Sequence, residues 1–199
     1  MKHPLDHPAL YALWQAPFAR QKLRPIGDLA ALRSEASVLD AACGPGDYAQ
    51  LFDPKGYVGI DTNAAYIERA NRKHSASRGH FTVADARTFD PPDRRFGLVF
   101  ANSFLHHLDD GGARAALANL ARLTAPGGRL LLMDLLLPET QGPARWLARA
   151  DRGDWPRSQQ HWLQLLETSY TPRRVEPYTL RLLGTPLWRM LFVEASPRR

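Results

Sequence analysis

The sequence predicts an α/β fold: a doubly wound, mostly parallel seven-stranded sheet with an antiparallel C-terminal hairpin strand and an N-terminal helical cap. Over residues 34–137, short apolar runs alternate with longer amphipathic segments, which is typical of parallel strands joined by crossover helices. Near the C-terminus, two apolar runs are joined through Gly184 and Pro186, which indicates a hairpin at one edge of the sheet. The 199 residues suit a single domain that buries its core without disulfides.

The cap is expected over residues 1–33, which have a helical pattern after Pro8 and Pro17. Its apolar set includes Leu10, Leu13, Trp14 and Phe18. Residues 34–137 form the expected core, with strands at Val38–Ala42, Tyr57–Ile60, Phe81–Ala84, Leu98–Ala101 and Arg129–Leu136. Residues 138–199 are expected to form a lid segment and then the closing hairpin, with strands at Val175–Leu182 and Leu187–Ala195.

Two helices are expected between the core strands. Asn63 is a suitable N-cap for the first, and Asp109 and Asp110 are expected to start the second, because acidic side chains are favourable at a helix N-terminus. The apolar positions of the first helix are Tyr66, Ile67 and Ala70, and those of the second are Leu117, Leu120 and Leu123. The second helix is expected to end before the breaker Pro126-Gly127-Gly128.

Composition and charge exclude several classes of protein. A single cysteine excludes an internal disulfide and a cysteine-based metal centre, and no apolar run approaches the roughly 20 residues of a membrane-spanning helix. We expect a cytoplasmic protein, because the first residues lack the unbroken apolar stretch of a signal peptide. Most of the net charge of +6 comes from residues 141–199, which contain 10 arginines and 5 acidic residues. These arginines form either a solvated face or a surface that binds phosphates.

The most informative segment is Val38–Tyr48, in which an apolar run ends in Asp40 and leads into a glycine-rich turn and a short expected helix. Gly44 and Gly46 would let the backbone approach a ligand, because a Cβ there would collide with it. In a doubly wound sheet, ligands bind beyond the carboxyl ends of the strands, where this turn lies. The segment from Gly44 to Ala49 also fits the G-x-G-x-x-A dinucleotide fingerprint, and a purely structural turn has the same pattern.

Two further acids end the next two strands. Asp61 lies 15 residues after Gly46, where a ribose diol would lie, and Asp85 ends the third strand. A dinucleotide explains Asp61 but has no need for Asp40 or Asp85, and a carboxylate repels a pyrophosphate. Carboxylates accept strong hydrogen bonds from an ammonium group and from paired hydroxyls. The three acids therefore favour S-adenosylmethionine over NAD.

With these motifs in order, the chain resembles the class I S-adenosylmethionine-dependent methyltransferases over roughly residues 38–137. The resemblance implies that Asp40 lies near the methionine part of the cofactor, that Asp61 holds the ribose hydroxyls and that Asp85–Ala86 holds the adenine. Ala42 stands where the family often has its first glycine, and we expect a tight turn there. The expected binding residues for S-adenosyl-L-methionine and its product S-adenosyl-L-homocysteine are Asp40, Ala42, Gly44, Gly46, Tyr48, Asp61, Thr62, Asp85, Ala86 and Asn102.

Two histidines follow the fourth strand, beside the expected position of the methyl group. His106 is the preferred catalytic residue, as a general base, and His107 is then expected to face the core. Such a pair is also structural in many members of the family. Asp134 lies beyond the cofactor loops and is expected to be a strand-end hydrogen-bonding group. No metal is expected, because no trio of aspartate and asparagine residues beyond the cofactor acids is evident.

The expected acceptor is a small molecule, apolar or aromatic and methylated at O, N or C. Its walls are expected from residues 1–33 and 138–165, which carry the aromatic residues Tyr11, Trp14, Trp146, Trp155 and Trp162. Ordinary helix packing is the alternative for each of these residues. Two other functions stay open, an RNA methyltransferase that uses the basic residues 141–199 and a cofactor-binding scaffold without turnover. The three intact acids argue against the scaffold.

Overall fold

The computed structural model describes residues 18–76, 80–140, 142–149 and 153–198. A seven-stranded sheet runs through the molecule in the order β3-β2-β1-β4-β5-β7-β6. Its strands are β1 (Val38–Ala41), β2 (Tyr57–Asp61), β3 (His80–Val83), β4 (Phe96–Asn102), β5 (Thr124–Leu135), β6 (Tyr170–Leu182) and β7 (Thr185–Pro197). Strands β1 to β5 pair in parallel, and β7 is antiparallel to both β5 and β6. The predicted fold class is confirmed.

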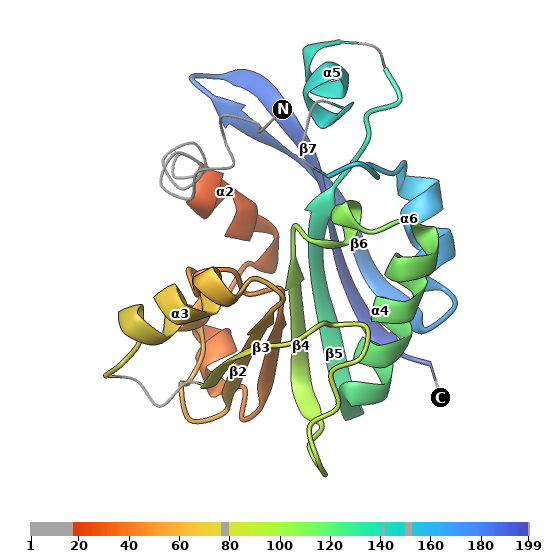
Figure 1. Cartoon of the computed structure of the whole chain (residues 1–199). Coiled ribbons are helices and arrows are strands. Elements are labelled where there is room, and N and C mark those ends of the chain that lie inside the picture. Colours follow the sequence, from red (N-terminus) through yellow and green to blue (C-terminus); the bar gives the residue numbers. More distant parts are fainter. Residues whose placement is uncertain (1–17, 77–79, 141, 150–152, 199) are drawn as a thin grey trace.

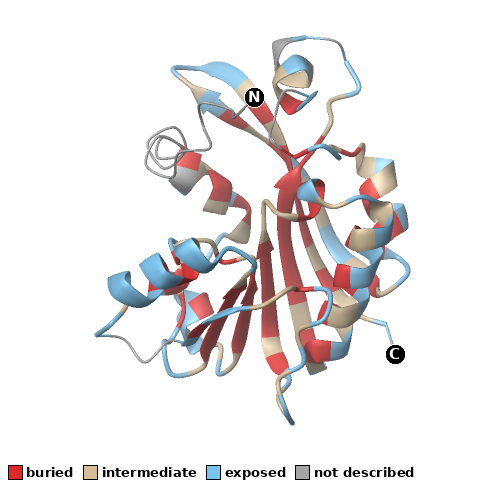
Figure 2. Ribbon diagram, in the orientation of Figure 1, coloured by how far each residue is buried: buried red, intermediate tan, exposed pale blue. Residues whose placement is uncertain are grey.

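Helices cover both faces of this sheet. The α-helices are α2 (Ala19–Leu23), α3 (Ala64–Lys73), α4 (Asp110–Leu123), α5 (Pro143–Arg149) and α6 (Gln159–Leu166), and the 3-10 helices are η3 (Arg24–Ile26), η4 (Ala30–Ser34), η5 (Ala49–Leu51) and η6 (Leu105–His107). Figure 1 shows α2 and α3 on one side of the sheet and α4 with α6 on the other. Buried residues are concentrated in the strands and on the sheet-facing sides of the helices (Figure 2). The core therefore consists of two apolar layers, one on each face of the sheet.

Local capping signals explain where the two long helices begin. The Asn63 side chain accepts hydrogen bonds from the backbone N–H groups of the first turn of α3, and the Asp109 side chain accepts one from Gly112 in α4. These contacts satisfy backbone donors that lack a partner inside the helix. Asn63 was expected in this role, and Asp109 and Asp110 were expected to start α4, so both predictions are confirmed.

The largest differences from the expected boundaries lie in the C-terminal half of the sheet. Strand β5 begins at Thr124, five residues before its expected start, and its pairing with β4 shifts register where the glycines of the breaker fall. Strand β6 begins at Tyr170 in place of Val175 and includes Pro172 and Pro177. Prolines are tolerated there because β6 is an edge strand, whose outer N–H groups have no ladder partner.

The described part of the expected N-terminal cap is helical, from Phe18 onward. Phe18 is fully buried. Hydrogen bonds fasten α2 to β6: the Gln21 side-chain amide donates to the Arg181 carbonyl and accepts from the Arg181 backbone N–H. The Tyr178 hydroxyl also donates to the Lys22 carbonyl. The other expected cap residues, Leu10, Tyr11, Leu13 and Trp14, lie outside the described residues. Within the described ranges, no helix is both long and apolar enough to cross a membrane.

Candidate active site

A pocket of about 790 Å³ lies beyond the carboxyl ends of β1 to β4, in the upper part of the size range for small-molecule sites. The position follows from the topology, because the strand order reverses between β1 and β4 and leaves a crevice there. Nine of the ten residues that the sequence assigned to the cofactor line it: Asp40, Ala42, Gly44, Tyr48, Asp61, Thr62, Asp85, Ala86 and Asn102. Residues far apart in the sequence therefore meet at one site.

Asp40 is the most deeply buried acid of the pocket wall, with an exposed fraction of 2%. Its Oδ2 accepts a hydrogen bond of 2.7 Å from the Tyr57 hydroxyl, which comes from the start of β2. Burial raises the pKa of Asp40 to about 7; the Tyr57 hydrogen bond opposes the rise and the nearby charge of Asp61 adds to it. Asp40 thus changes charge near neutral pH, and Tyr57 favours its ionised form.

The turn after β1 is tight at its first residue. Ala42 has a φ of 61°, in the left-handed region that glycine adopts most easily, so alanine takes the expected turn conformation at a conformational cost. Gly44 also has a positive φ, and a Cβ on it would meet open space.

Gly46 differs from Gly44 in what it faces, and its place among the cofactor-binding residues stays a prediction. Gly46 is not among the described residues that line the pocket. A Cβ on it would come within 3.0 Å of the Phe81 ring and 3.1 Å of the His74 ring. Glycine is favoured at this position because the loop packs closely against these side chains and because its φ is 74°.

Asp61 holds two loops together at the tip of β2. Its Oδ2 accepts a hydrogen bond of 2.9 Å from the Gly44 N–H, and its Oδ1 accepts one of 2.8 Å from the Asn63 N–H. A carboxylate has about four lone-pair sites, so it can accept further hydrogen bonds from a ligand. The sequence indicated a ligand-binding acid here but gave no sign that this acid also shapes the glycine-rich turn.

Asp85, beyond β3, is paired with an arginine that sequence reasoning missed. The Arg87 guanidinium contacts both carboxylate oxygens, with an Nη2–Oδ2 distance of 2.5 Å. This hydrogen bonding, opposed by partial burial, holds the pKa of Asp85 below its usual value, so Asp85 is ionised at neutral pH. Both residues line the pocket. The signal was present as an Asp-x-Arg spacing, which places the two side chains within reach of each other.

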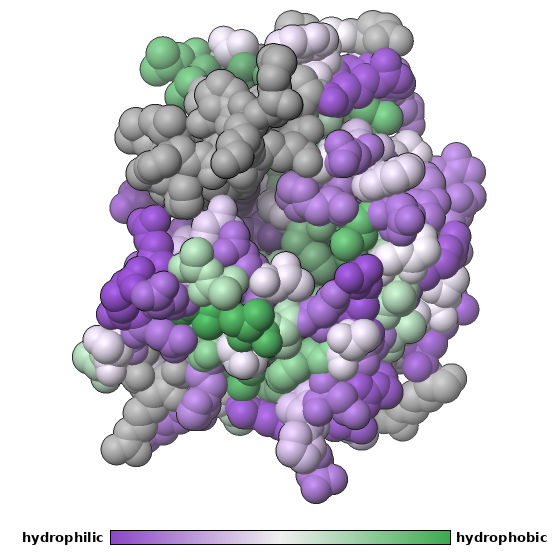
Figure 3. Space-filling view, viewed as in Figure 1, coloured by the Kyte–Doolittle hydropathy of each residue, from purple (hydrophilic) through white to green (hydrophobic). Residues whose placement is uncertain are grey.

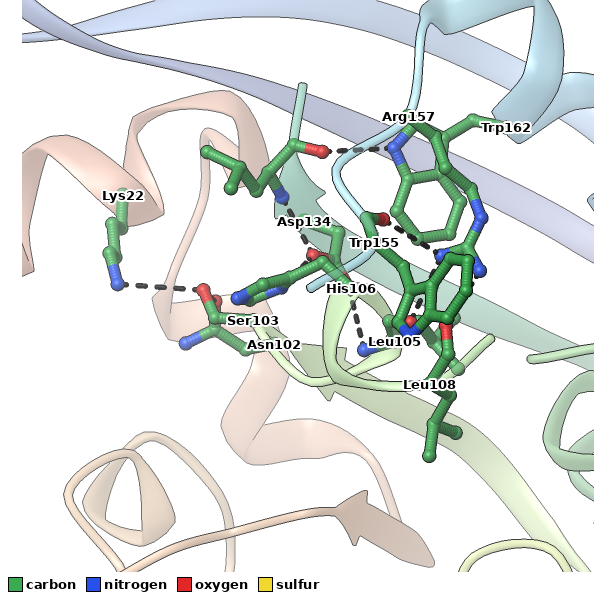
Figure 4. A network of polar contacts seen from close by, with 11 residues as sticks. Lys22, Asn102, Ser103, Leu105, His106, Leu108, Asp134, Trp155, Arg157 and Trp162 are labelled. Atoms are coloured by element: carbon green, nitrogen blue, oxygen red, sulfur yellow. Dashed lines mark hydrogen bonds and ion pairs between the residues drawn. The ribbon is translucent and has the colours of Figure 1, made fainter. Parts of the chain in front are cut away.

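The far end of the pocket lies over the tip of β4, where α2 approaches. Lys22 Nζ is 3.5 Å from Ser103 Oγ, and Ser103 Oγ donates a 3.0 Å hydrogen bond to Asn102 Oδ1 (Figure 4). Ser103 has a φ of 55°, which is rare for a residue with a side chain and sharply turns the chain away from β4. Leu23 and Phe104 also line this end of the pocket.

Comparison with known proteins agrees with this arrangement. Residues 38–128 match the family model described as a methyltransferase domain. The chain is 37% identical over 128 residues to 27-O-demethylrifamycin SV methyltransferase of Amycolatopsis mediterranei, and 32% identical over 148 residues to trans-aconitate 2-methyltransferase of Methylobacterium nodulans. These matches cover 61% and 70% of this chain and 46% and 54% of the relatives, so the chain spans about half of each relative's length.

The fold comparison includes a structure with the cofactor product bound. N-methyltransferase NodS from Bradyrhizobium japonicum, in complex with S-adenosyl-l-homocysteine, superposes with a TM-score of 0.71 and 18% identity. The superposition covers 92% of this chain and 89% of that chain. Residues 38–128 form a methyltransferase domain, and the chain has the fold of S-adenosylmethionine-dependent methyltransferases. Its pocket fits the cofactor of this family, because carboxylates line the wall at three strand ends and the open side of Gly44 leaves room for a ligand.

The two histidines after β4 are oriented opposite to the prediction. His107 lines the pocket, whereas His106 is buried, with an exposed fraction of 4%. His106 Nδ1 lies 2.5 Å from Asp134 Oδ1 (Figure 4). Asp134 is itself fully buried at the end of β5 and accepts hydrogen bonds from the backbone N–H groups of Leu105 and Leu135. Asp134 is therefore a strand-end hydrogen-bonding group, as predicted, and it draws the His106 ring inward.

A second segment covers His106 from outside. Gly153 packs closely on the His106 imidazole: a Cβ on this glycine would lie 2.0 Å from the Cδ2 atom of His106. The backbone N–H of Trp155 donates a hydrogen bond to the His106 carbonyl. Arg157, 3% exposed, donates to the carbonyls of Leu105 and Leu108 at 3.0 and 2.6 Å and pairs with a carboxylate of α4. This arginine belongs to the basic segment that was expected to be a solvated face or a surface for phosphates, and it instead fastens its own segment to the loop after β4.

Of the five aromatic residues expected in the walls of the acceptor site, Trp146, Trp155 and Trp162 do not line the pocket, and Tyr11 and Trp14 lie outside the described residues. Trp162 is fully buried against the sheet, where its indole N–H donates to the Leu135 carbonyl. Trp146 and Trp155 are exposed, at 69% and 48%, and neither lines the pocket. Trp162 therefore belongs to the packing between α6 and the sheet, and Trp146 and Trp155 are surface residues. The apolar lining comes instead from Leu23, Leu51, Phe104 and Leu108.

The surface around the site is mixed in polarity. Figure 3 shows hydrophobic residues gathered near the middle of this face, with hydrophilic residues around them. In the described part of the chain, no group of three or more histidine, cysteine, aspartate or glutamate side chains is placed to hold a metal ion.

Proposed function

We propose that this chain transfers a methyl group from S-adenosylmethionine to a small organic acceptor, with residues 1–199 acting as one methyltransferase domain. The observation that carries the proposal is the single pocket that joins three acidic strand ends to the tip of β4. One ligand reaching from Asp85 to Asp40 leaves the β4 end of the pocket for a second molecule. A site for two ligands side by side is what a group transfer requires.

The residues of the chain act by binding and orientation. When bound, the cofactor supplies an activated methyl group, so the protein has little covalent chemistry to perform. Asp61 accepts hydrogen bonds from the ribose hydroxyls, Asp85 and Ala86 bind the adenine, and ionised Asp40 attracts the ammonium of the methionine part. Gly44, Thr62, Tyr48 and Asn102 complete the wall. Holding the acceptor in line with the methyl group is then the main contribution to rate.

The acceptor is a small molecule with an apolar body. Leu23, Phe104 and Leu108 give the pocket an apolar lining near the β4 end, and such lining with few polar groups is typical of small-molecule sites. The similarity to methyltransferases named for rifamycin and trans-aconitate acceptors supports this class. His106 as a general base has less support, because its ring is held by Asp134 and covered by Gly153.

RNA as the acceptor has less support than a small molecule. Several arginines of the basic C-terminal third bond within the protein: Arg157 as described above, Arg174 to Glu176 and to the Pro25 carbonyl, and Arg189 to the Thr179 hydroxyl. Phosphate binding would have to compete with these contacts. RNA retention that falls steeply with salt, together with no turnover of small molecules, would favour the RNA alternative.

Calorimetric titration tests the proposal. We expect S-adenosylmethionine and S-adenosylhomocysteine to bind, and NADH not to bind, because a pyrophosphate would face Asp40 and Asp85. If neither adenosyl compound binds at millimolar concentration, the methyltransferase hypothesis is contradicted. Binding of NADH in their place would establish a dinucleotide site. Binding without release of the demethylated product for any acceptor would favour the scaffold.

A further inference from the structure

The glycine-rich loop after β1, residues 42–48, has a backbone that needs support from neighbouring elements. Ala42, Gly44 and Gly46 have positive φ angles of 61°, 55° and 74°. Residues with a side chain rarely adopt this region, and glycine loses the most conformational freedom when it is fixed in one conformation. Contacts from outside the loop must therefore offset the cost of holding the loop in this shape.

The C-terminal end of α3 supplies such contacts. His74, the C-cap residue of α3, places its Nε2 atom 2.8 Å from the Gly46 carbonyl oxygen. Because a carbonyl oxygen can only accept, Nε2 carries the proton and donates this hydrogen bond. The His74 ring also stacks on Phe81, with 5.3 Å between the ring centroids. The preceding residue, Lys73, pairs with Asp47 at a distance of 2.6 Å, so two consecutive residues of α3 hold two consecutive residues of the loop.

His74 contacts the loop from behind the pocket wall. Gly44 and Asp47 of the loop line the pocket, whereas His74 and Gly46 are not among the described lining residues. At the pocket wall, the Gly44 N–H donates to Asp61 at the tip of β2. The loop is thus held between Asp61 and the end of α3, and a change at His74 reaches a ligand in the pocket through the loop.

We infer that His74 is a positioning residue for the cofactor, which holds the Gly46 carbonyl and so keeps the loop in the shape that binds the methionine part. This inference rests on the proposed function. If the loop has this shape for only a fraction of the time, the apparent dissociation constant rises by the inverse of that fraction. Lys73 makes a smaller contribution, because its ion pair with Asp47 is exposed and such pairs are weak.

The first test is calorimetric titration of the whole protein with S-adenosylhomocysteine. His74→Phe keeps an aromatic ring against Phe81 and removes the donor, so binding should weaken about three- to ten-fold. His74→Gln keeps an N–H donor near the position of Nε2 and should retain most of the affinity. The matched control is His80→Phe, because His80 is an exposed histidine at the start of β3 and outside the pocket. It should bind like the wild type.

Hydrogen exchange of the free protein, followed by mass spectrometry, separates release of the loop from a loss of global stability. In His74→Phe, exchange should become faster in residues 42–48 while β4 keeps its protection, and saturating S-adenosylhomocysteine should slow the loop again. If His74→Phe does not fold, Lys73→Met should show faster exchange in the same loop. Its control is Arg72→Met, because Arg72 pairs with Glu68 outside the pocket, and this variant should exchange like the wild type.

Three results would each overturn the inference: wild-type affinity in His74→Phe, equal weakening in both His74 variants, or faster exchange that extends through β4. The two proposals fail separately. If the wild type does not bind S-adenosylhomocysteine, the proposed function fails, and hydrogen exchange of the free protein still tests whether His74 holds the loop. If the wild type binds and His74→Phe changes neither affinity nor loop exchange, only the role of His74 fails.

Discussion

Removal of the Tyr57 hydroxyl should shift the pH dependence of cofactor binding upward. Tyr57 donates a 2.7 Å hydrogen bond to Asp40, and this contact favours the ionised carboxylate that would attract the cofactor ammonium. The phenol remains the donor at any accessible pH, because burial raises the pKa of Tyr57 well above its ordinary value. Tyr57→Phe keeps the ring that stacks on Phe52 and removes only the oxygen.

The size of the shift follows from the hydrogen bond. A hydrogen bond to a charged group contributes about 1.5–3 kcal/mol, and one pKa unit corresponds to about 1.4 kcal/mol. The pKa of Asp40, about 7 in the wild-type protein, should therefore rise by about 1–2 units in the variant. Affinity for the cofactor increases with pH as Asp40 loses its proton, so the variant should need a higher pH to reach its full affinity.

The assay is calorimetric titration with S-adenosylhomocysteine between pH 5.5 and 9. The matched control is Tyr170→Phe, which removes a buried hydroxyl that contacts Thr124 in the other core layer. Its pH profile should follow the wild type. A Tyr57→Phe profile that coincides with the wild type would refute the reasoning, because the hydroxyl would then have no influence on the charge of Asp40.

Three further predictions use the same contacts. Because burial raises the pKa of Asp40 from 3.8 to about 7, the native state holds its proton more tightly than the unfolded chain; the contribution of Asp40 to stability should be greatest below about pH 4 and fall by about 4 kcal/mol as the pH rises to about 7, and urea denaturation of Asp40→Asn should lack this part of the wild-type pH dependence. Asp61→Ala should weaken S-adenosylhomocysteine binding by about 2–3 kcal/mol, while Asp53→Ala, an exposed acid outside the pocket, should not; equal affinities would show that the ribose lies elsewhere. His106→Gln should lower the free energy of unfolding by about 1.5–3 kcal/mol through its lost contact with Asp134 and leave the pH profile of turnover unchanged; a shifted profile with unchanged stability would restore His106 as a base.

Features set by local patterns were predictable from the sequence. Apolar runs that end in an acid gave the strand tips at Asp40, Asp61 and Asp85, and the turn chemistry at Asn63 and Asp109 gave two helix starts. Each of these signals lies within a few residues along the chain, where strand or helix periodicity and capping decide the structure. Parallel strands then bring the tips to one edge of the sheet without further information.

Features set by distant contacts were not predictable. The orientation of His106 depends on Asp134, 28 residues away, and the charge of Asp40 depends on Tyr57, 17 residues away. Arginine is usually a surface residue, and the sequence around Arg157 gives no sign that it is buried. The fold surrounds its guanidinium with carbonyl groups of the loop after β4. Which side chain reaches which partner depends on packing between elements, which residue periodicity does not encode.

A crystal structure of the complex with S-adenosylhomocysteine tests the account most directly. We predict the ribose hydroxyls at Asp61, the adenine beside Asp85 and Ala86, and the sulfur directed to the β4 end of the pocket, toward Asn102. Space for the acceptor should remain between that sulfur and the Lys22 ammonium. An adenosyl group over the tip of β4, or outside the pocket altogether, would contradict the assignment of the strand-end acids.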